Sequence, residues 1–392
     1  MKDAHRFATL AVHAGESPCP ATGALDTPIY QSTTFVSADS GEMAAVYGEQ
    51  KSGYMYTRYG NPTIHALEEK VAALEGGEAA LAFSSGMAAI SSAILGYVKA
   101  GDHVVAARSV YGAAYNFLNT KLPRLGASTT FVPSSRIEDF EKAIQPNTRL
   151  IYFETPSNPI LAIVDIAALA EMANKRGIPT MIDNTFASPA LQRPIPLGVT
   201  VSVHSATKYL CGHGDAMGGM VIGPKNYISL LIHEVIRDFG GVISPFNAWL
   251  ILRGIRTLHL RMPAHCSNAQ KVTEFLAQHP RVEHVNYPGL PSHPGHEIAR
   301  KQMSAFGAMI SFEVRGGYEN GKKVMDRVKI FARAASLGDT RSLIVHSAST
   351  SHRAVPRDQR LAIGITDGLV RLSVGVEAAE DLVADLDQAL AF

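Results

Sequence analysis

The sequence lacks most of the features that mark zinc-binding, secreted or nucleic-acid-binding proteins. Its 392 residues include three cysteines, which lie far apart and form no C-x-x-C pair, so neither a zinc site nor a disulfide framework is predicted. The charges nearly balance, with 36 Lys and Arg against 35 Asp and Glu, which excludes a strongly basic surface for nucleic acids or anionic membranes. No apolar run is long enough to span a bilayer, and no signal peptide is visible after Met1. We therefore expect a cytoplasmic protein without a metal, nucleic-acid or membrane partner.

Motifs for nucleotide binding and zinc-dependent proteolysis are missing too. The chain contains no Walker A pattern and no H-E-x-x-H. The stretch from Gly212 to Gly218 has one residue too many for G-x-G-x-x-G, and it follows a lysine turn instead of opening a βαβ unit. Hydrophobic residues make up 46% of the sequence and charged residues 18%, which is typical of a well-packed enzyme. The length of 392 residues predicts two or three domains.

Strands and helices alternate through most of the chain. Short apolar runs separated by amphipathic segments predict strands near residues 79–83, 103–107, 129–132, 149–153, 179–183 and 200–204. This alternation is typical of a mostly parallel sheet that is covered on both faces. After residue 245, a long helical stretch broken by Pro263 precedes short strands near residues 282–287, 308–314 and 368–374. We expect an α/β protein with three parts: an irregular arm (1–60) that reaches a neighbouring subunit, a large domain (61–245) and a smaller C-terminal α/β domain (246–392).

The most informative stretch runs from Val201 to Asp215 and presents Lys208 just after a β-branched run. Ser205 and Thr207 place hydroxyl groups beside this amine. The stretch allows three interpretations: a surface lysine that ends a core strand, the S-x-x-K pattern of serine acyl-transfer enzymes, or a lysine that binds the carbonyl of pyridoxal 5′-phosphate (PLP). The serine enzymes also require S-D-N and K-T-G, and neither tripeptide occurs.

An acid upstream of the lysine favours the PLP interpretation. Asp183 ends the buried run Thr180-Met-Ile-Asp183. A carboxylate at the C-terminal end of a strand could keep the pyridine nitrogen of the cofactor protonated, which makes the ring an electron sink. We therefore expect Lys208 and Asp183 to serve one PLP site.

Other polar residues follow predicted strands and are expected at the same edge of the sheet. Ser84-Ser-Gly86-Met87 is a turn from a strand into a helix, which places free backbone N–H groups against a phosphate. Tyr111 and Asn158 also follow strands. Because ligands of open α/β sheets bind at the C-terminal ends of the strands, these positions predict a single site.

Two further segments carry candidate anion-binding groups. Tyr56 and Arg58 lie in a loop bounded by Gly53 and Pro62, where an arginine fork could bind an anion; the alternative is a solvated turn. Arg371 lies inside the apolar strand Leu369-Val-Arg-Leu-Ser-Val374. A buried arginine needs a carboxylate partner, which is either the α-carboxylate of a substrate or an acid of the protein such as Glu377.

Five ordered motifs together resemble the Cys/Met-metabolism family of PLP enzymes, and the resemblance runs nearly end to end. The motifs are Tyr56-Thr-Arg58-Tyr-Gly-Asn-Pro-Thr63, Ser85-Gly86-Met87, Asp183-Asn, Ser205-Ala-Thr-Lys208-Tyr and Arg371-Leu-Ser-Val-Gly375. The resemblance implies the aspartate-aminotransferase-like fold (fold type I), PLP as the cofactor, and a homotetramer built from two active dimers.

The resemblance also implies a role for each candidate residue. Lys208 would bind the cofactor and move protons, Asp183 would pair with the pyridine nitrogen, and Tyr111 would stack on the ring and protonate the leaving group. The phosphate would be bound by Gly86, Met87, Ser205 and Thr207, together with Tyr56 and Arg58 of the adjacent subunit. The substrate carboxylate would be bound by Arg371, Ser336 and Asn158.

Within the family, Gly212-His-Gly-Asp215 and Ser336-Leu-Gly-Asp339 resemble methionine γ-lyases, which convert L-methionine into 2-oxobutanoate, ammonia and methanethiol. Ala335 stands where cystathionine γ-lyases and γ-synthases usually carry a glutamate. Ala113 replaces the cysteine that is usual in methionine γ-lyases, and Thr340-Arg341 resembles the O-acetyl- and O-succinyl-homoserine sulfhydrylases. Elimination and replacement at Cγ therefore both stay open, and the alternatives within the family are the sulfhydrylases and the cystathionine γ-lyases and γ-synthases. Outside the family the alternative is a serine acyl-transfer enzyme that uses Ser205 and Lys208.

Overall fold

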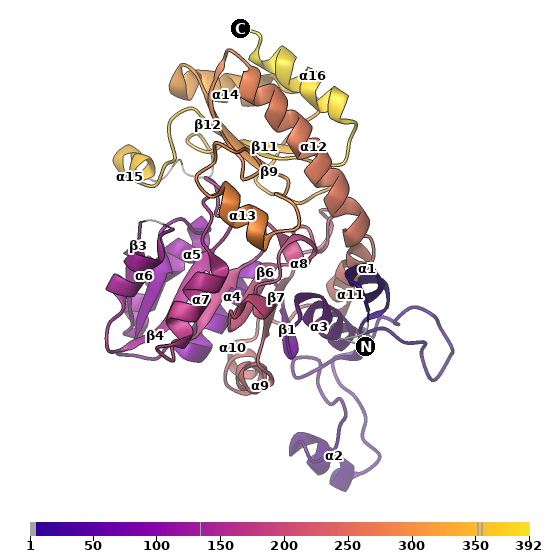
Figure 1. The fold of residues 1–392 in the computed structure, drawn as a ribbon. Helices are drawn as coiled ribbons and strands as arrows, with labels where there is room; N and C mark the ends of the chain where they lie inside the picture. Colours follow the sequence, from indigo (N-terminus) through magenta and orange to yellow (C-terminus); the bar gives the residue numbers. More distant parts are fainter. Residues whose placement is uncertain (1–4, 134, 351–352, 354–355) are drawn as a thin grey trace.

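Two β-sheets, one below the other in Figure 1, organise the computed structural model, which describes residues 5–133, 135–350, 353 and 356–392. The larger sheet has seven strands in the order β1-β7-β6-β5-β4-β2-β3. Most of its residues are β-branched or small and apolar, which suits strands buried on both faces. The strands are β1 (Ala79–Phe83), β2 (His103–Ala107), β3 (Ser128–Val132), β4 (Thr148–Glu154), β5 (Thr180–Asp183), β6 (Val201–Ser205) and β7 (Gly219–Gly223).

The larger sheet is mostly parallel, as the sequence predicts. Strands β2 to β6 pair in parallel, while β7 runs antiparallel to both of its neighbours, β1 and β6. The sequence pattern did not predict β7, because glycines at both of its ends obscure a short apolar run. The C-terminal ends of β1, β2, β4, β5 and β6 therefore lie at one edge of the sheet.

Helices pack on both faces of this sheet (Figure 1). They are α3 (Pro62–Glu75), α4 (Gly86–Tyr97), α5 (Gly112–Asn116), α6 (Ile137–Ala143), α7 (Ile166–Asn174), α8 (Ser188–Leu191), α9 (Lys225–Leu231) and α10 (Arg237–Phe239). Helix α4 begins at Gly86, within the predicted turn, because the Ser85 side chain accepts a hydrogen bond from the Ala88 N–H group and caps the first turn. The capped turn thus belongs to the strand-to-helix junction that was expected to face a phosphate.

A second sheet has five strands in the order β10-β11-β12-β9-β8. Its strands are β8 (Val282–Asn286), β9 (Met309–Val314), β10 (Ala332–Arg333), β11 (Leu343–His346) and β12 (Leu369–Ser373). The helices of this part are α13 (His296–Gln302), α14 (Gly317–Arg327), α15 (Arg357–Ala362) and α16 (Ala379–Leu390). The large parallel sheet and the smaller C-terminal α/β layer agree with the expected fold class, whereas the domain boundaries at residues 60 and 245 stay a prediction.

The expected helix break at Pro263 is wrong. Two helices, α11 (Pro245–Ile255) and α12 (Leu258–Gln278), meet at Arg256 and Thr257, and Pro263 lies inside α12. Proline removes one backbone hydrogen bond of the helix. A long buried face, which includes Met262 and Ala269, offsets that loss, because most helical stability in proteins comes from packing. None of the helices among the described residues is both long and apolar enough to cross a membrane.

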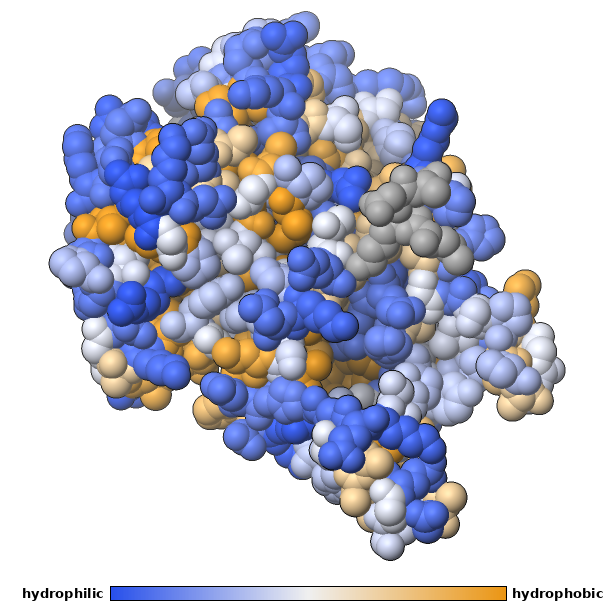
Figure 2. All heavy atoms as spheres, turned by 60° about the horizontal axis from the view of Figure 1, so that its bottom comes forward, coloured by the Kyte–Doolittle hydropathy of each residue, from blue (hydrophilic) through white to orange (hydrophobic). Residues whose placement is uncertain are grey.

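The N-terminal arm contains two short helices that its composition did not predict, α1 (Phe7–His13) and α2 (Ser40–Tyr47). Helix α1 packs on α3 and α12, whereas α2 projects away from both sheets at the bottom of Figure 1. Figure 2 views the molecule from this side and shows hydrophobic surface between hydrophilic residues. Large apolar side chains of the arm and of α10 are exposed, including Leu25 at 81% and Phe239 at 74%.

A buried ion-pair network attaches the first part of the arm to α3 and α11. Lys70 of α3 is completely buried, and its Nζ lies 2.7 Å from Oε1 of Glu16 and 2.8 Å from the carbonyl oxygen of Ala11. Glu16 also accepts two hydrogen bonds from Arg256, at the end of α11. Burial raises the pKa of Glu16, but the hydrogen bonds and charges of Arg256 and Lys70 lower it by more, so the net shift is downward.

We expect Lys70→Met to lower the free energy of unfolding by about 3 kcal/mol, because it leaves Glu16 buried with one cation fewer. Urea unfolding followed by the fluorescence of Trp249 measures the effect, since α11 carries this residue and packs on α3. Lys51→Met is the matched control: Lys51 pairs with Glu42 at the surface, and its loss should change nothing measurable.

The same network predicts an acid-sensitive attachment of the arm. Because the folded-state pKa of Glu16 is lowered, its contribution to stability is complete above the ordinary carboxyl pKa and is lost as the pH falls through the lowered value. The difference in stability between wild type and Lys70→Met should therefore shrink in acid, and a difference independent of pH would contradict this account.

Candidate functional site

The predicted site residues of the large sheet lie at one edge, where five strands end. They are Ser84–Met87 after β1, Tyr111 after β2, Asn158 after β4, Asp183 at the end of β5 and Ser205–Lys208 at the end of β6. Because all five strands run in the same direction, their C-terminal ends and these residues share one edge. Such an edge is where open α/β sheets bind ligands.

Lys208 lies in a turn that backbone hydrogen bonds fix on both sides. Its N–H group donates to the carbonyl of Ser205 at 3.2 Å, and its carbonyl accepts from the Gly212 N–H group at 2.7 Å. The amine Nζ donates to Ser336 Oγ at 2.8 Å, and not to Ser205 as a serine acyl-transfer enzyme would need. Burial, and then the charge of Arg371, lowers the pKa of Lys208 to about 8, so part of the amine is uncharged and nucleophilic near neutral pH.

Two buried carboxyl groups lie side by side at this edge, because Glu154 of β4 pairs in register with Asp183 of β5. Burial raises the pKa of Asp183, while hydrogen bonds from Thr185 oppose the shift. Burial, and then the neighbouring Asp183, raises the pKa of Glu154 well above its ordinary value. The upward shift favours the neutral form of Glu154, whereas hydrogen bonds support the ionised form of Asp183, which makes Asp183 the better acid to pair with a positively charged ring nitrogen.

Glu154 is a site residue that our sequence reasoning missed. Its Oε2 accepts the backbone N–H group of Tyr111 at 2.7 Å, and the N–H group of Asn158 also hydrogen-bonds to this carboxyl. It therefore links the loops that carry two predicted site residues. The signal was present in the sequence, because Glu154, like Asp183, is an acid at the end of an apolar strand.

The start of α4 forms a tight junction with the end of β6. The N–H groups of Gly86 and Met87 are the first two of the helix and have no acceptor within it. A Cβ atom on Gly86 would lie 2.8 Å from Cβ of Ser205, so only glycine permits this approach. Thr207 is fixed by hydrogen bonds with the N–H and carbonyl groups of Gly218, at 3.1 and 3.3 Å. These groups make a compact cradle for an anion such as a phosphate.

Arg371 is buried without a carboxylate partner. Its Nη1 donates to Asn158 Oδ1 at 2.9 Å and its Nη2 donates to the carbonyl oxygen of Ser336 at 3.0 Å, while Nε has no partner. Among the described residues no acid lies within ion-pair distance of Arg371, and Glu377 instead accepts hydrogen bonds from Ser342. The salt-bridge alternative for Arg371 is therefore wrong, and a buried cation that lacks an acid suits the carboxylate of a ligand.

The loop that carries Ser336 closes the site from the side of the smaller sheet. Gly338 adopts a φ of +72°, and a Cβ atom there would come within 2.6 Å of the Tyr209 backbone nitrogen. Its N–H group donates to Ser373 Oγ of β12 at 2.9 Å. Ser336 consequently contacts both the amine of Lys208 and the guanidinium of Arg371.

Tyr111 borders the site with an accessible ring. Its side chain is 46% exposed, although its backbone is fixed by Glu154 at the start of α5. An aromatic ring that the protein does not cover is available to stack on a flat ligand.

Tyr56 and Arg58 are not brought to the other site residues within one chain. Arg58 donates to the carbonyl of Arg237 and lies over the rings of Tyr56 and Tyr59. Arg58 and Tyr59 line a cavity of about 710 Å³ next to α9 and α10, and neither Lys208 nor Asp183 is among its lining residues. The alternative of a fully solvated turn is wrong, since Arg58 stacks on two tyrosines.

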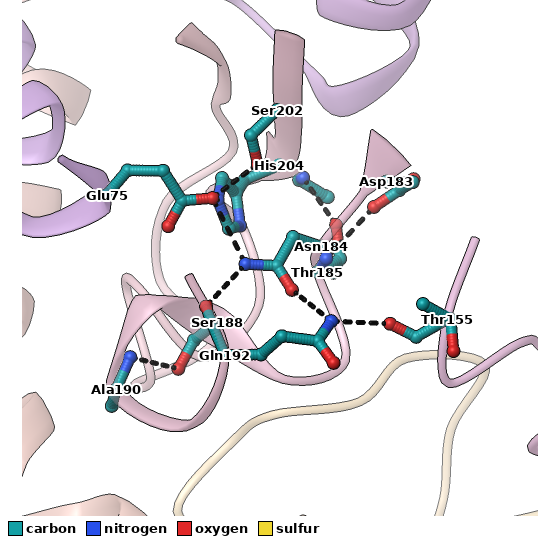
Figure 3. Close-up of polar contacts among 11 residues, drawn as sticks. Glu75, Thr155, Asp183, Asn184, Thr185, Ser188, Ala190, Gln192, Ser202 and His204 are labelled. Atoms are coloured by element: carbon teal, nitrogen blue, oxygen red, sulfur yellow. Dashed lines mark hydrogen bonds and ion pairs between the residues drawn. The ribbon is translucent and has the colours of Figure 1, made fainter. Parts of the chain in front are cut away.

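A second buried polar network lies behind the site and was not predicted (Figure 3). Asn184, which follows Asp183, donates from Nδ2 to Glu75 Oε1 at 3.1 Å and to the carbonyl of Gln192 at 2.9 Å. His204 Nε2 lies 3.2 Å from the same Glu75 oxygen. The partners come from α3, from β6 and from the residues that directly follow β5 and α8, so their association depends on tertiary structure that periodicity does not reveal.

Comparison with known proteins gives a full-length match. The family model described as Cys/Met metabolism PLP-dependent enzyme matches residues 8–391. An L-methionine gamma-lyase of Porphyromonas gingivalis is 50% identical over 98% of this chain and 96% of its own. A cystathionine gamma-lyase of Bacillus subtilis is 47% identical over 97% of this chain and 98% of its own.

The fold also matches that of a solved structure. The crystal structure of metB from Corynebacterium glutamicum superimposes with a TM-score of 0.94 and is 43% identical, covering 100% of this chain and 99% of that one. The expected fold type I architecture is thereby confirmed.

Proposed function

Because the chain belongs to the Cys/Met metabolism family of PLP-dependent enzymes, we propose that it is a methionine γ-lyase. The reaction consumes L-methionine and water and yields 2-oxobutanoate, ammonia and methanethiol. The observation that carries the substrate choice is Ala335, an exposed residue beside Ser336. Its methyl group offers no charge to the distal amino and carboxyl groups of cystathionine, whereas the uncharged end of methionine needs none.

The residues at the sheet edge fit PLP. The amine of Lys208, with its lowered pKa, suits the aldehyde of the cofactor, and the buried Asp183 suits its ring nitrogen. The cradle of Gly86, Met87, Ser205 and Thr207 suits the phosphate, because a side chain at Gly86 would fill it. When bound, PLP supplies an electron sink that stabilises negative charge at the substrate's Cα.

Side chains of the protein transfer the protons that the reaction requires. Lys208 removes the proton from Cα of the substrate and transfers protons at Cβ, which its lowered pKa permits near neutral pH. Tyr111, with its ring exposed at the edge, donates a proton to the departing sulfur so that methanethiol leaves uncharged. Glu154 holds the backbone of Tyr111 in place for this transfer.

Arg371, Asn158 and Ser336 orient the substrate by its carboxylate. Arg371 is the buried cation without an acid, and Asn158 and Ser336 already fix its guanidinium plane. A fixed fork binds a carboxylate in one orientation, which directs Cα toward the amine of Lys208.

We further propose that the enzyme is a cytoplasmic homotetramer of two active dimers, in which Tyr56 and Arg58 of one chain complete the phosphate site of the next. In the single chain these two residues lie beside α10 and away from Lys208. The exposed apolar side chains of the arm, together with the hydrophobic surface in Figure 2, support burial of this side against another copy.

The pKa of Lys208 predicts how cofactor uptake depends on pH. Because the uncharged amine is the nucleophile, the rate at which the apoenzyme takes up PLP should rise as the pH increases through about 8. Stopped-flow absorbance measures this rate. In Arg371→Gln the midpoint should move upward, because the neighbouring positive charge is removed; an unchanged midpoint would count against the interaction.

Product analysis tests the proposed reaction directly. The purified enzyme with PLP is given L-methionine alone, then O-acetyl- or O-succinyl-homoserine with sulfide or methanethiol, and 2-oxobutanoate and amino-acid products are followed together. Oxobutanoate and methanethiol from methionine support the γ-lyase. No reaction with methionine, and efficient formation of homocysteine or methionine from an acyl-homoserine, would make the enzyme a sulfhydrylase, the alternative favoured by Ala113 and Thr340-Arg341.

A further inference from the structure

Glu75 occupies an unfavourable position for a carboxylate. It is the last residue of α3, where the partial negative charge of the helix C-terminus opposes an anion, and it is completely buried. Its Oε1 accepts hydrogen bonds from Ser202, Asn184 and His204, whereas Oε2 has no partner. Within the described residues no lysine or arginine lies within ion-pair distance of Glu75, so His204 is the cation available to it.

His204 faces Glu75 inside the protein. The ring is buried, and Nε2 lies 3.2 Å from Glu75 Oε1. Oε1 of Glu75 thus meets three polar groups, of which the imidazole of His204 is the one that could carry a positive charge. The second ring nitrogen, Nδ1, has no hydrogen-bond partner.

Asn184 connects Glu75 and His204 to Asp183, the acid of the proposed active site. Asn184 directly follows Asp183, donates its N–H group to the carbonyl of Val203 at 2.9 Å, and binds Glu75 through its side chain. Figure 3 shows Asp183 on one side of Asn184, and Glu75 with His204 on the other. The segment that carries Asp183 is thereby tied to the pair.

The imidazole of His204 also acts on Asp183. Burial raises the pKa of Asp183, whereas hydrogen bonds from Thr185 and the charge of His204 lower it. The other titratable groups near Asp183 are Tyr152 and Glu154 of β4, and burial raises the pKa of both, which favours their neutral forms. His204 is therefore the one neighbour among these three whose charge can favour the ionised form of Asp183.

We propose that Glu75 and His204 form a buried ion pair that keeps Asp183 ionised and in place, so that Glu75 is a positioning residue for the acid that pairs with the cofactor ring. The inference rests on the proposed function, because it takes Asp183 as that acid. This role would explain why Glu75 is a buried carboxylate at a helix C-terminus, a position that neither packing nor the helix dipole favours.

The first test uses the apoenzyme and needs no substrate. Nitrogen NMR of protein labelled at histidine, with the His204 signal identified by its loss in His204→Gln, reports whether both ring nitrogens carry protons. We expect a doubly protonated ring in the wild type and a neutral ring in Glu75→Gln under the same conditions. A neutral His204 in the wild type overturns the proposal, whether or not the variant folds.

The second test compares the loss of the Glu75 charge with the loss of one neutral contact to the same carboxylate. Glu75→Gln removes the charge and keeps the shape, whereas Ser202→Ala removes a neutral donor to the same oxygen. We expect Glu75→Gln to weaken PLP binding about tenfold and to lower kcat by a similar factor with KM unchanged, since Arg371 is untouched. Ser202→Ala should stay within about twofold of the wild type in both quantities.

Equal losses in the two variants would show that the network is only structural and would overturn the proposal. The outcome is separable from that of the proposed function. An enzyme with a charged His204 and normal PLP binding that does not act on methionine contradicts the γ-lyase assignment and leaves the ion pair intact.

Discussion

Replacing Lys208 with alanine is expected to lower kcat for L-methionine by about three to four orders of magnitude. The substitution removes the group that takes and returns protons at Cα and Cβ, and proton transfer by a positioned side chain contributes up to about 10⁴-fold. It also removes the amine that holds the cofactor, so the visible absorbance of the lysine-bound form should disappear. Steady-state assays of 2-oxobutanoate and an absorbance spectrum measure both effects.

Stability separates this loss from unfolding. Burial lowers the pKa of Lys208, which means that the folded protein disfavours its charge, so Lys208→Ala should not lower the melting temperature of the apoenzyme. Lys225→Ala is the matched control, because Lys225 starts α9 away from the sheet edge. Retained turnover in Lys208→Ala, or the same loss in Lys225→Ala, would contradict the assigned role.

Replacing Arg371 with leucine is expected to lower kcat/KM for methionine by about 30- to 1000-fold. Truncating one partner of a buried, hydrogen-bonded charge pair costs about 2–4 kcal/mol, and each 1.4 kcal/mol is a factor of ten. Most of the effect should lie in KM, because the guanidinium binds the carboxylate and does not touch the bond that breaks. Arg371→Lys should recover only part of the loss, since an ammonium group cannot replace both Nη contacts to Asn158 and Ser336.

A second buried arginine provides the control. Arg261 of α12 also has an unpartnered nitrogen and a pKa lowered to about 10 by burial, but its hydrogen bonds go to the carbonyl oxygens of Tyr209 and Gly254 and to the hydroxyl of Thr257. Arg261→Lys should reduce stability and leave KM unchanged. An increase in KM of equal size in both variants would mean that Arg371 acts through the fold and not through the substrate.

The sequence predicted the central features of the fold because they are local. Apolar runs of four to seven residues followed by polar turns identified the strands around Asp183 and Lys208, and the parallel arrangement placed both residues at one edge. The motifs supplied the remaining site residues; the structure places Gly86 against Ser205 and joins Arg371 to Asn158, while their roles toward a phosphate and a carboxylate stay a prediction.

What the sequence did not predict depends on contacts between distant segments. Glu154 was overlooked although it obeys the same rule as Asp183, and only the pairing of β4 with β5 shows that the two acids are neighbours. Glu75 and His204 are 129 residues apart and read as ordinary helix and strand positions. The low helix propensity of proline predicted a break at Pro263, whereas the packing of the buried face of α12 outweighs this propensity.

The position of Arg58 has a consequence for mixtures of defective chains. Within one chain Arg58 contacts Arg237 and not the edge that carries Lys208. In the proposed assembly each catalytic centre combines Lys208 of one polypeptide with Arg58 of another. A chain without Lys208 and a chain without Arg58 would then complement each other, because their hybrid contains one centre in which both residues are intact. Two inactive proteins would thus regain activity on being unfolded and reassembled together, as two damaged copies of a gene can restore a function that neither provides alone.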